Sequence, residues 1–342
     1  MMDQRVTMAQ LARNLGVAES TVSRALRNDP KISARTRKRV KAQAEKSGYR
    51  PNALISALMA NRRGLQGPHP DTVALITDYR EKGGWRSKDV CQWEYHGICQ
   101  RAAKLGYRIE EFALADFGHD GTRLEKALRT RNIRGVLFGF SRGQAGDFRF
   151  NPDHFSVAGL SSYFNQLSLD RANFHGLYNV SLAMESLKNL GYRRIGLVVP
   201  EFNNRISGYQ WSGGSLDWQR RQTAESRCAP LIIGEDSDQS GHFNRWLDRE
   251  KPDSLVVYKL PVRAWISRQQ RPSARSIAIT HLYRSQAERD QSAGIDGNLD
   301  LVGAAAFDLV VEGLHTNRTG LPENPKEVLI KGSWHSDHLR ME

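Results

Sequence analysis

Hydrophobic residues near the start of the chain recur at the spacing of short amphipathic helices. The apolar face of the first predicted helix consists of Met8, Leu11, Ala12 and Leu15. Thr7 begins this helix in a capping box with Gln10, and Gly16 ends it. A second helix is expected a few residues later, and a third from residue 33 to residue 48. Three short helices with a glycine turn between the first two predict an all-α helix-turn-helix domain.

The hydrophobic pattern changes after residue 70, where short apolar runs alternate with stretches of helical spacing. The runs predicted to be buried strands are residues 73–77, 108–112, 135–140, 156–160, 194–199, 230–233, 254–258 and 276–280. The helical stretches between them include residues 94–105, 122–131, 177–190 and 301–315. This alternation predicts an α/β domain with parallel sheets. Ligands of such sheets bind beyond the carboxyl ends of the strands.

Positive charge is concentrated at the N-terminal end of the chain. Residues 1–64 contain 14 Lys and Arg residues against 4 Asp and Glu residues, whereas the remaining 278 residues contain 36 against 33. Nearly all of the formal net charge of +13 therefore belongs to the small domain. A concentrated positive field attracts polyanions, nucleic acid first and an anionic membrane second.

The second predicted helix has one apolar and one polar face. Val22 and Leu26 lie on the apolar face, and the outward face carries Glu19, Ser20, Ser23, Arg24 and Arg27. In a helix-turn-helix domain this helix enters the major groove. Arg bonds guanine bidentately, Ser bonds either base, and Glu accepts from cytosine. The polar face therefore predicts sequence-specific binding of double-stranded DNA.

Residues 6–54 resemble the DNA-binding headpiece of the lactose-repressor (LacI/GalR) family of bacterial transcriptional regulators. The matching motifs include TVSRAL at 21–26, SGY at 47–49 and RPN at 50–52. The resemblance implies a homodimer on a near-palindromic DNA operator, because protein and DNA symmetry should match. By position it implies base contacts at Glu19, Ser20 and Arg24. It implies phosphate contacts at Thr7, Thr21 and Ser23.

Two residues of the headpiece depart from the family pattern. Ala18 stands where the family usually has the serine that caps the recognition helix. Either Ser20 takes over this cap, or the helix loses about 1 kcal/mol of stability. Arg27 stands in place of a usual Asn and adds a possible phosphate contact.

A short hinge helix is expected to follow the headpiece. Asn52 caps it, and its apolar residues are Leu54, Ile55, Leu58 and Met59. A helix of this length is marginal alone in water. The resemblance implies that it orders on the operator and that Leu58 wedges into the minor groove, as other apolar side chains do. Packing of this helix on its own domain is the alternative. Residues 66–70 then form a linker.

The large domain resembles the family's effector domain, which shares its fold with periplasmic binding proteins. The predicted organisation is a headpiece at 1–50, hinge and linker at 51–70, and an effector-binding and dimerisation domain at 71–342. Its N-subdomain is expected at about 71–167 plus 300–322, and its C-subdomain at about 168–299 plus 323–342. The resemblance implies three crossings between the subdomains, near 165–170, 295–300 and 320–326.

Polar and aromatic residues that follow the predicted strands are candidates for an effector site in the cleft. They are Asp78, Tyr79, Trp85, Trp93, Ser141, Tyr163, Arg205, Trp218, His281 and Asp296. Aromatic faces with a few polar groups suit a sugar-like ligand. Arg205 is the strongest candidate, since it matches the family's effector-binding arginine. Each Trp taken singly is more often a core residue than a pocket residue.

Two family features are missing after the strands at 254–258 and 276–280. Lys259-Leu-Pro261 stands where most members have Asn-Asp, and His281-Leu-Tyr283 where many have acidic residues. Two acceptors of sugar hydroxyls are therefore lost. Three interpretations stay open: an unusual ligand, a repurposed pocket, or no small ligand at all.

Other classes of function find no support in the sequence. It contains no HExxH and no phosphate-loop motif, and its three cysteines lack metal-ligand spacing. We therefore expect no enzymatic activity, metal or cofactor, and reduced thiols. No apolar run approaches the roughly 18 residues of a membrane helix, and the N-terminus lacks the apolar core of a signal peptide. The expected location is the bacterial cytoplasm, at the nucleoid.

The sequence as a whole predicts a transcriptional repressor whose operator affinity depends on a small, sugar-like ligand bound between two subdomains. The alternative is a DNA-binding regulator that is controlled by a protein partner instead. The sequence leaves open the identity of the effector, whether it induces or co-represses, the operator, and dimer against tetramer.

Overall fold

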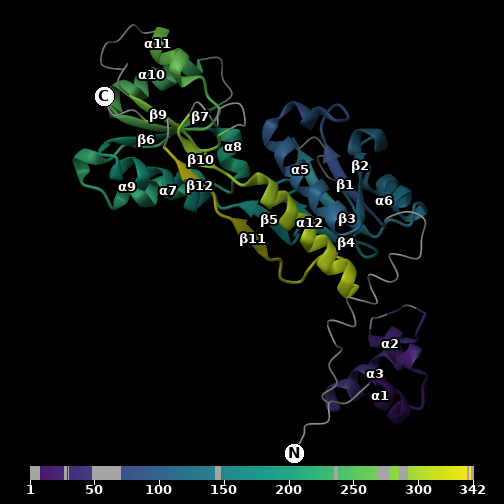
Figure 1. Cartoon of the computed structure of the whole chain (residues 1–342). Helices are drawn as coiled ribbons and strands as arrows, with labels where there is room; N and C mark the ends of the chain where they lie inside the picture. The colour runs from purple at the N-terminus through teal and green to yellow at the C-terminus, as the bar shows by residue number, and fades with distance from the viewer. Residues whose placement is uncertain are drawn as a thin grey trace, which may run out of the picture.

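The computed structural model describes residues 8–26, 29, 31–47, 71–142, 148–234, 238–268, 277–284, 292–336 and 339 (Figure 1). Several predicted features lie outside the described residues. They are the hinge helix and linker at 51–70 and the DNA contacts assigned to Thr7, Arg27, Asn52 and Leu58.

The headpiece consists of α1 (Met8–Leu15), α2 (Glu19–Leu26) and α3 (Ala34–Lys46). Its core is formed by small and branched side chains from all three helices, including Leu11, Val22 and Val40, each at most 1% exposed. Gly16 has a φ of +66°, the left-handed conformation that ends α1 and turns the chain into α2. The helix-turn-helix prediction is confirmed.

The first sheet of the large domain is parallel, with strand order β11-β5-β4-β3-β1-β2. The strands are β1 (Asp71–Asp78), β2 (Tyr107–Ala113), β3 (Gly135–Ser141), β4 (Ser156–Leu160), β5 (Arg171–Phe174) and β11 (Glu327–Ile330). On one face, Val73 and Leu75 pack with α5 (Asp89–Lys104) and α12 (Leu299–Thr316). On the other, Ala74 and Ile76 pack with α6 (Gly121–Thr130). Alternate residues of a strand thus supply two cores.

The second sheet has strand order β12-β10-β9-β8-β6-β7, with β12 antiparallel to β10. The strands are β6 (Ile195–Pro200), β7 (Leu231–Ile233), β8 (Ser254–Val257), β9 (Ala278–His281), β10 (Gly294–Asp296) and β12 (Ser333–His335). One face is covered by α7 (Gly176–Asn189) and α9 (Gln210–Arg220). The other is covered by α10 (Gln239–Glu250) and α11 (Val262–Arg268). The short helix α8 (Glu201–Ile206) directly follows β6.

These two sheets confirm the predicted fold class, and all eight predicted strands are present. Four further strands, β5, β10, β11 and β12, were not predicted from the sequence. Each has only three or four residues. Segments this short do not show an alternating pattern that distinguishes them from loops.

Two of the predicted subdomain boundaries are wrong. Because β5 pairs with β4 and β11 pairs with β5, residues 168–174 and 323–330 belong with the first sheet. The chain therefore crosses to the second sheet after Phe174 and again between Ile330 and Ser333, later than expected. The middle crossing, between β10 and α12, falls within the expected 295–300. Hydrogen bonds join the crossing segments, including His175 N to Ile330 O at 2.8 Å and Asn298 Nδ2 to Lys331 O at 2.9 Å.

Candidate functional site

The helix α2 presents a polar face outward from the headpiece core. Val22 and Ala25 are buried, whereas Glu19, Ser20 and Arg24 are exposed. Thr21 and Ser23, the predicted phosphate contacts within the described residues, are half-buried. Ala18 accepts the first helical hydrogen bonds through its carbonyl, and its methyl group supplies no side-chain cap. The exposed residues have the donors and acceptors that base edges require.

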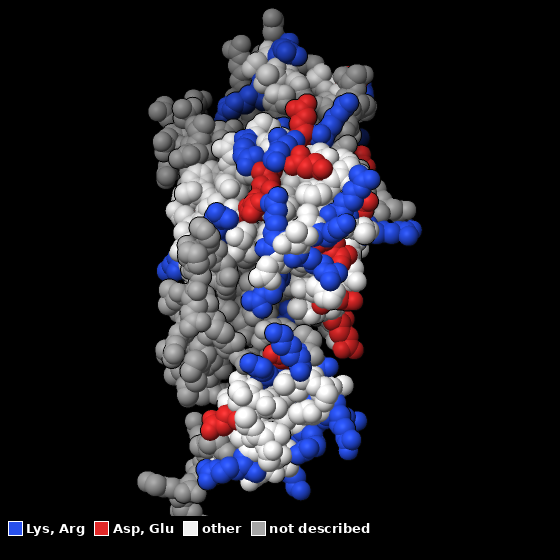
Figure 2. All heavy atoms as spheres, turned by 90° about the vertical axis from the view of Figure 1, so that its right-hand side faces the viewer, with Lys and Arg blue, Asp and Glu red and all other residues white. Residues whose placement is uncertain are grey.

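We call the exposed polar face of α2, formed by Glu19, Ser20 and Arg24, the reading face. The third helix adds positive charge to the same domain. It carries six basic residues, Arg35, Arg37, Lys38, Arg39, Lys41 and Lys46. Arg39 Nη2 donates to the Leu15 carbonyl at 2.7 Å, so this guanidinium also holds the end of α1. Figure 2 shows that Lys and Arg dominate the charged side chains of the headpiece in view, whereas both signs mix over the large domain. The headpiece thus combines a reading helix with a field that attracts phosphates.

A cavity of about 240 Å³ lies between the two sheets of the large domain. It is lined by residues at the carboxyl ends of strands from both sheets, including Tyr79 after β1, Ser141 in β3, Tyr163 after β4 and Tyr258 after β8. This is the position at which open parallel sheets bind ligands. The cleft predicted from the strand pattern is therefore present as a cavity.

One wall of the cavity is aromatic. Phe174 stacks on Trp211 with ring centroids 5.6 Å apart, and Trp211 packs on Tyr258 at 4.7 Å. Phe174 ends β5 in the first sheet, whereas Trp211 and Tyr258 come from the second half. The wall therefore depends on how the two halves meet. Such a surface favours a flat or apolar ligand face.

A buried carboxyl group lines the same cavity. Glu94 is 1% exposed, and its Oε1 accepts a hydrogen bond of 2.6 Å from the Ser161 hydroxyl. Within the described residues, its Oε2 has no hydrogen-bond partner. Burial raises the pKa of the Glu94 carboxyl to about 8, although the Ser161 hydrogen bond acts in the opposite direction. At neutral pH this carboxyl is therefore mainly uncharged.

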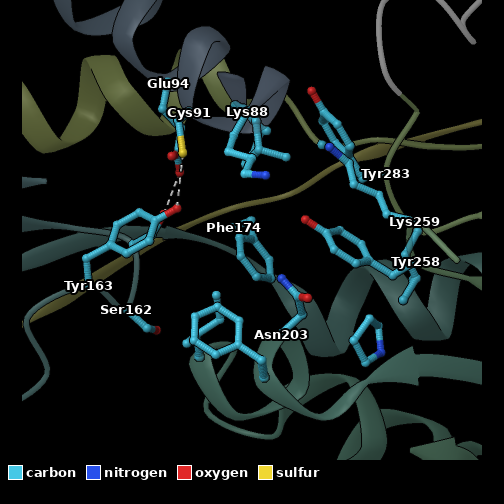
Figure 3. A pocket seen from close by; sticks show the side chains of 18 of the residues that line it. Lys88, Cys91, Glu94, Ser162, Tyr163, Phe174, Asn203, Tyr258, Lys259 and Tyr283 are labelled. Atoms are coloured by element: carbon cyan, nitrogen blue, oxygen red, sulfur yellow. Dashed lines mark hydrogen bonds between the residues drawn. The ribbon is translucent and has the colours of Figure 1, made fainter. Parts of the chain in front are cut away.

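Cysteine and tyrosine side chains surround this carboxyl (Figure 3). The Cys91 Sγ lies 3.7 Å from the Tyr163 hydroxyl and 4.0 Å from the Tyr79 hydroxyl. Burial raises the pKa of the Cys91 thiol to about 12. A thiol that keeps its proton is a poor nucleophile, so this part of the cavity is suited to binding rather than to thiol chemistry.

Two glycines fix the position of Glu94 by allowing α5 and α12 to pack closely. A Cβ atom at Gly97 would overlap the main-chain carbonyl of Asp300, and one at Gly303 would overlap that of Glu94. Any larger residue at either position would push the two helices apart. This contact sets the depth at which α5 presents Glu94 and Cys91 to the cavity.

Three cationic side chains lie around the cavity and connect its two halves. The ammonium of Lys259, after β8, forms an ion pair with Asp89 at the start of α5 and lies 4.8 Å from the Tyr283 ring centroid. The Arg142 guanidinium, after β3, lies 4.4 Å from the ring centroid of Phe202 on α8. Lys88, next to Asp89, also lines the cavity. Its ammonium points into the open space in Figure 3.

Comparisons with known proteins agree with these features. Residues 7–52 match the family model described as bacterial regulatory proteins, lacI family. The lac repressor dimer bound to operator and the anti-inducer ONPF has a similar fold, with a TM-score of 0.54, 16% identity, and 97% of this chain and 98% of that chain covered. The headpiece therefore matches the lacI family of bacterial regulatory proteins, and the chain as a whole shares its fold with the lac repressor.

Two other similar proteins cover this chain to different extents. The HTH-type transcriptional regulator PtxS of Pseudomonas plecoglossicida is 27% identical over 56% of this chain, and the match spans only 53% of that relative's length. The structure of the transcriptional regulator CelR–cellobiose complex has a TM-score of 0.54 at 16% identity and covers 97% of this chain and 98% of its own. Both of these similar proteins are named as transcriptional regulators.

Two further classes of site are absent from the described part of the chain. None of its helices is long and apolar enough to span a membrane. None of its groups of His, Cys, Asp and Glu side chains is arranged to hold a metal ion.

Three of the residues predicted for the effector site line the cavity: Tyr79, Ser141 and Tyr163. Asp78 lies just behind it, fully buried, where its Oδ2 accepts a hydrogen bond of 2.9 Å from the Ser141 hydroxyl. Asp78 therefore orients a lining residue and does not itself line the cavity.

The other predicted effector residues are not brought to the cavity. Trp85 and Trp218 are core residues, whose indole N–H groups donate to Glu111 and Glu185. Trp93 packs at the edge of the first core. The remaining three are Arg205, His281 and Asp296. Arg205 is exposed on α8, while its neighbours Asn203 and Ile206 line the cavity instead. His281 and Asp296 end β9 and β10, one residue before the lining residues Leu282 and Gly297.

Sequence reasoning missed several lining residues, and one of them left a signal. Glu94 falls in register with the buried positions Cys91, Ile98 and Ala102 on one face of α5, where a carboxyl group is out of place. The misplaced carboxyl could have identified Glu94 as a site residue. The departures from the family pattern also mark the site, since Lys259 and Tyr283 both line the cavity.

Proposed function

We propose that this protein is a DNA-binding transcriptional regulator, acting as a repressor, whose operator affinity is controlled by a small molecule in the cleft. The observation that carries the proposal is the polar face of α2, with Glu19, Ser20 and Arg24 exposed above a buried core. The lac repressor neighbour is a dimer bound to operator, which supports operator binding by this chain.

The proposed mechanism links the headpiece to the cleft. A homodimer presents two α2 helices to the half-sites of a near-palindromic operator, and the segment around Leu58 orders in the central minor groove. Ligand binding between the two sheets changes how the halves close. Coupling of this kind is typically about 1–3 kcal/mol and is reciprocal, so DNA and ligand alter each other's affinity equally. A protein that acts on operator DNA in this way works at the bacterial nucleoid, in the cytoplasm.

The cleft favours a small molecule over a protein partner as the controlling signal. A cavity of about 240 Å³ between two sheets can enclose a small molecule, whereas a protein partner could place only single side chains in it. The CelR neighbour is a complex with cellobiose, so a carbohydrate stays a candidate ligand.

The experiment that tests the proposed function is a selection of random duplexes by the purified full chain, followed by sequencing. We expect a palindromic site with a deformable central step, bound by a homodimer. Binding to the selected site should exceed binding to a scrambled duplex by at least 10³-fold at a fixed salt concentration. Steeply salt-dependent binding without sequence preference would overturn the proposal, because it would reduce the headpiece to a basic patch.

A further inference from the structure

The electrostatic character of the cavity is cationic. The residues that line it include Lys88, Arg142 and Lys259, and Glu94 is its one acidic side chain within the described residues. That carboxyl is fully buried and mainly protonated at neutral pH, so it does not balance the cations. Lys259 is paired with Asp89, whereas no carboxylate in the described part of the chain forms an ion pair with Lys88 or Arg142. An anion that enters the cleft therefore meets two cations, Lys88 and Arg142, that form no ion pair within the described residues, whereas Asp89 already balances the charge of Lys259.

Most of the small polar side chains in the cavity are already engaged with the protein. Ser141 donates to Asp78, Ser161 donates to Glu94, and Ser162 accepts from Asn173. The Asn179 carbonyl oxygen accepts from the Gly332 N–H at 2.8 Å. A neutral sugar needs many hydrogen-bond partners for its hydroxyl groups, since buried polar groups without partners are costly. The serine side chains of the cavity are therefore already bonded to the protein, and a neutral sugar would depend on Asn203 and the tyrosine hydroxyl groups.

Another part of the cavity wall is aromatic. The Phe174, Trp211 and Tyr258 rings form a continuous surface between the two halves. A volume of about 240 Å³ exceeds the roughly 150 Å³ of a cavity that holds benzene. The space therefore fits one ring with one or two substituents. Glu94 Oε2, buried and without a partner in the described residues, is available to a polar substituent.

On the basis of the proposed function of this cleft, we propose that its ligand is a small organic anion with a single flat ring. The ring lies against Phe174, Trp211 and Tyr258. Its carboxylate or phosphate group lies beside Lys88, which has no ion-pair partner within the described residues and whose ammonium points into the open space (Figure 3). The buried Glu94 carboxyl accommodates a hydroxyl or amide substituent on the ring.

Calorimetric titration of the full chain with matched probes tests this proposal. Benzoate and phenyl phosphate carry the two anionic groups, benzamide has the shape of benzoate without its charge, and glucose and cellobiose represent neutral sugars. We expect one site per chain for benzoate or phenyl phosphate, with benzamide and the sugars at least tenfold weaker. The anion that binds with the higher affinity shows whether the site favours a carboxylate or a phosphate group.

Two variants connect the binding to the cleft. Lys88→Gln should weaken the anion at least tenfold and leave benzamide unchanged, because it removes charge and keeps most of the side chain. Lys104→Gln, at the far end of α5, is the control and should change neither. If Lys88→Gln lowers the melting temperature, the role of charge can be tested in the natural chain instead. Added salt should then weaken the binding of benzoate but not the binding of benzamide.

Several results would overturn the proposal. They are benzamide binding as tightly as benzoate, a sugar binding more tightly than either anion, and no binding of either anion at millimolar concentration. A chain that binds its selected duplex but neither anion would refute the ligand class and leave DNA regulation intact. A chain that selects no duplex but binds benzoate would refute the proposed function alone.

Discussion

The reading helix and the cleft cavity collect their residues over very different lengths of chain. The face of α2 is assembled from residues 19–24, all within a single helix of eight residues. The cavity takes residues from Tyr79 to Leu299, at the ends of strands in both sheets. A site within one helix is fixed by local spacing, whereas a site between two sheets depends on crossings and register. The first is therefore robust to changes elsewhere, and the second is sensitive to them.

The largest expected effect tests that sensitivity at the contact between α5 and α12. Gly303→Leu should destabilise the large domain by about 3 kcal/mol or more, because its side chain would overlap the Glu94 main chain. Urea unfolding monitored by tryptophan fluorescence measures this loss. Gly213→Leu is the matched control: Gly213 lies in helix α9 with open space around it, so this change should cost little. Equal effects would show that the helix contact is not tight.

The next effect concerns the buried carboxyl of the cavity. Glu94 holds its proton more tightly in the folded protein than in the unfolded chain, since its pKa rises from 4.5 to about 8. Between these values the folded state binds the extra proton, so the free energy of unfolding should fall as the pH rises, by at most about 1.4 kcal/mol per unit. Urea unfolding at pH 5.5 and pH 7.5 measures the slope.

Glu94→Gln should flatten this dependence, because the amide still accepts the Ser161 hydrogen bond but does not titrate. Glu201→Gln, at an exposed position on α8, should leave it unchanged. A slope in Glu94→Gln equal to that of the natural chain would assign the pH dependence to other groups.

A smaller and more local effect is expected on the reading helix. Arg24→Ala should cost about 1–3 kcal/mol of specific DNA binding and relax the preference at particular base positions. Repeating the duplex selection with this variant shows where the preference is lost. Lys46→Ala, exposed at the end of α3, is the comparison and should weaken binding evenly across sequences. An even loss in Arg24→Ala as well would make Arg24 a phosphate contact.

The smallest effect is expected for the ion pair across the cleft. The side chains of Lys259 and Asp89 are each about one-third exposed, at 33% and 36%, so their coupling should be at most about 1 kcal/mol. A double-mutant cycle of Asp89→Asn and Lys259→Gln in urea unfolding isolates it. Additive effects would mean that the pair does not hold the two halves together.

How far the sequence predicted the fold depended on the length of each element. Strands such as β1 and β3 showed their apolar runs clearly, whereas β5 and β11 were too short to detect. Missing them displaced two subdomain boundaries. The cavity shows the same limit, because the sequence pattern does not determine which residue near the end of a strand faces the cavity. Tyr79 and Tyr163 line the cavity, but Arg205 and His281 lie one residue away from residues that do.

The sequence by itself determined the headpiece, its reading face and its positive charge. It also determined that strands and helices alternate in the large domain. These features depend on spacing within a helix or strand, which the chain carries locally. Only the tertiary structure decided which aromatic rings form the cavity wall and which fill the cores. Trp211 and Trp85 are alike as residues, yet the first lines the cavity and the second is sealed against Phe140. The two residues differ because only Trp211 lies where the two halves of the large domain face each other. The local spacing of hydrophobic residues does not determine that position.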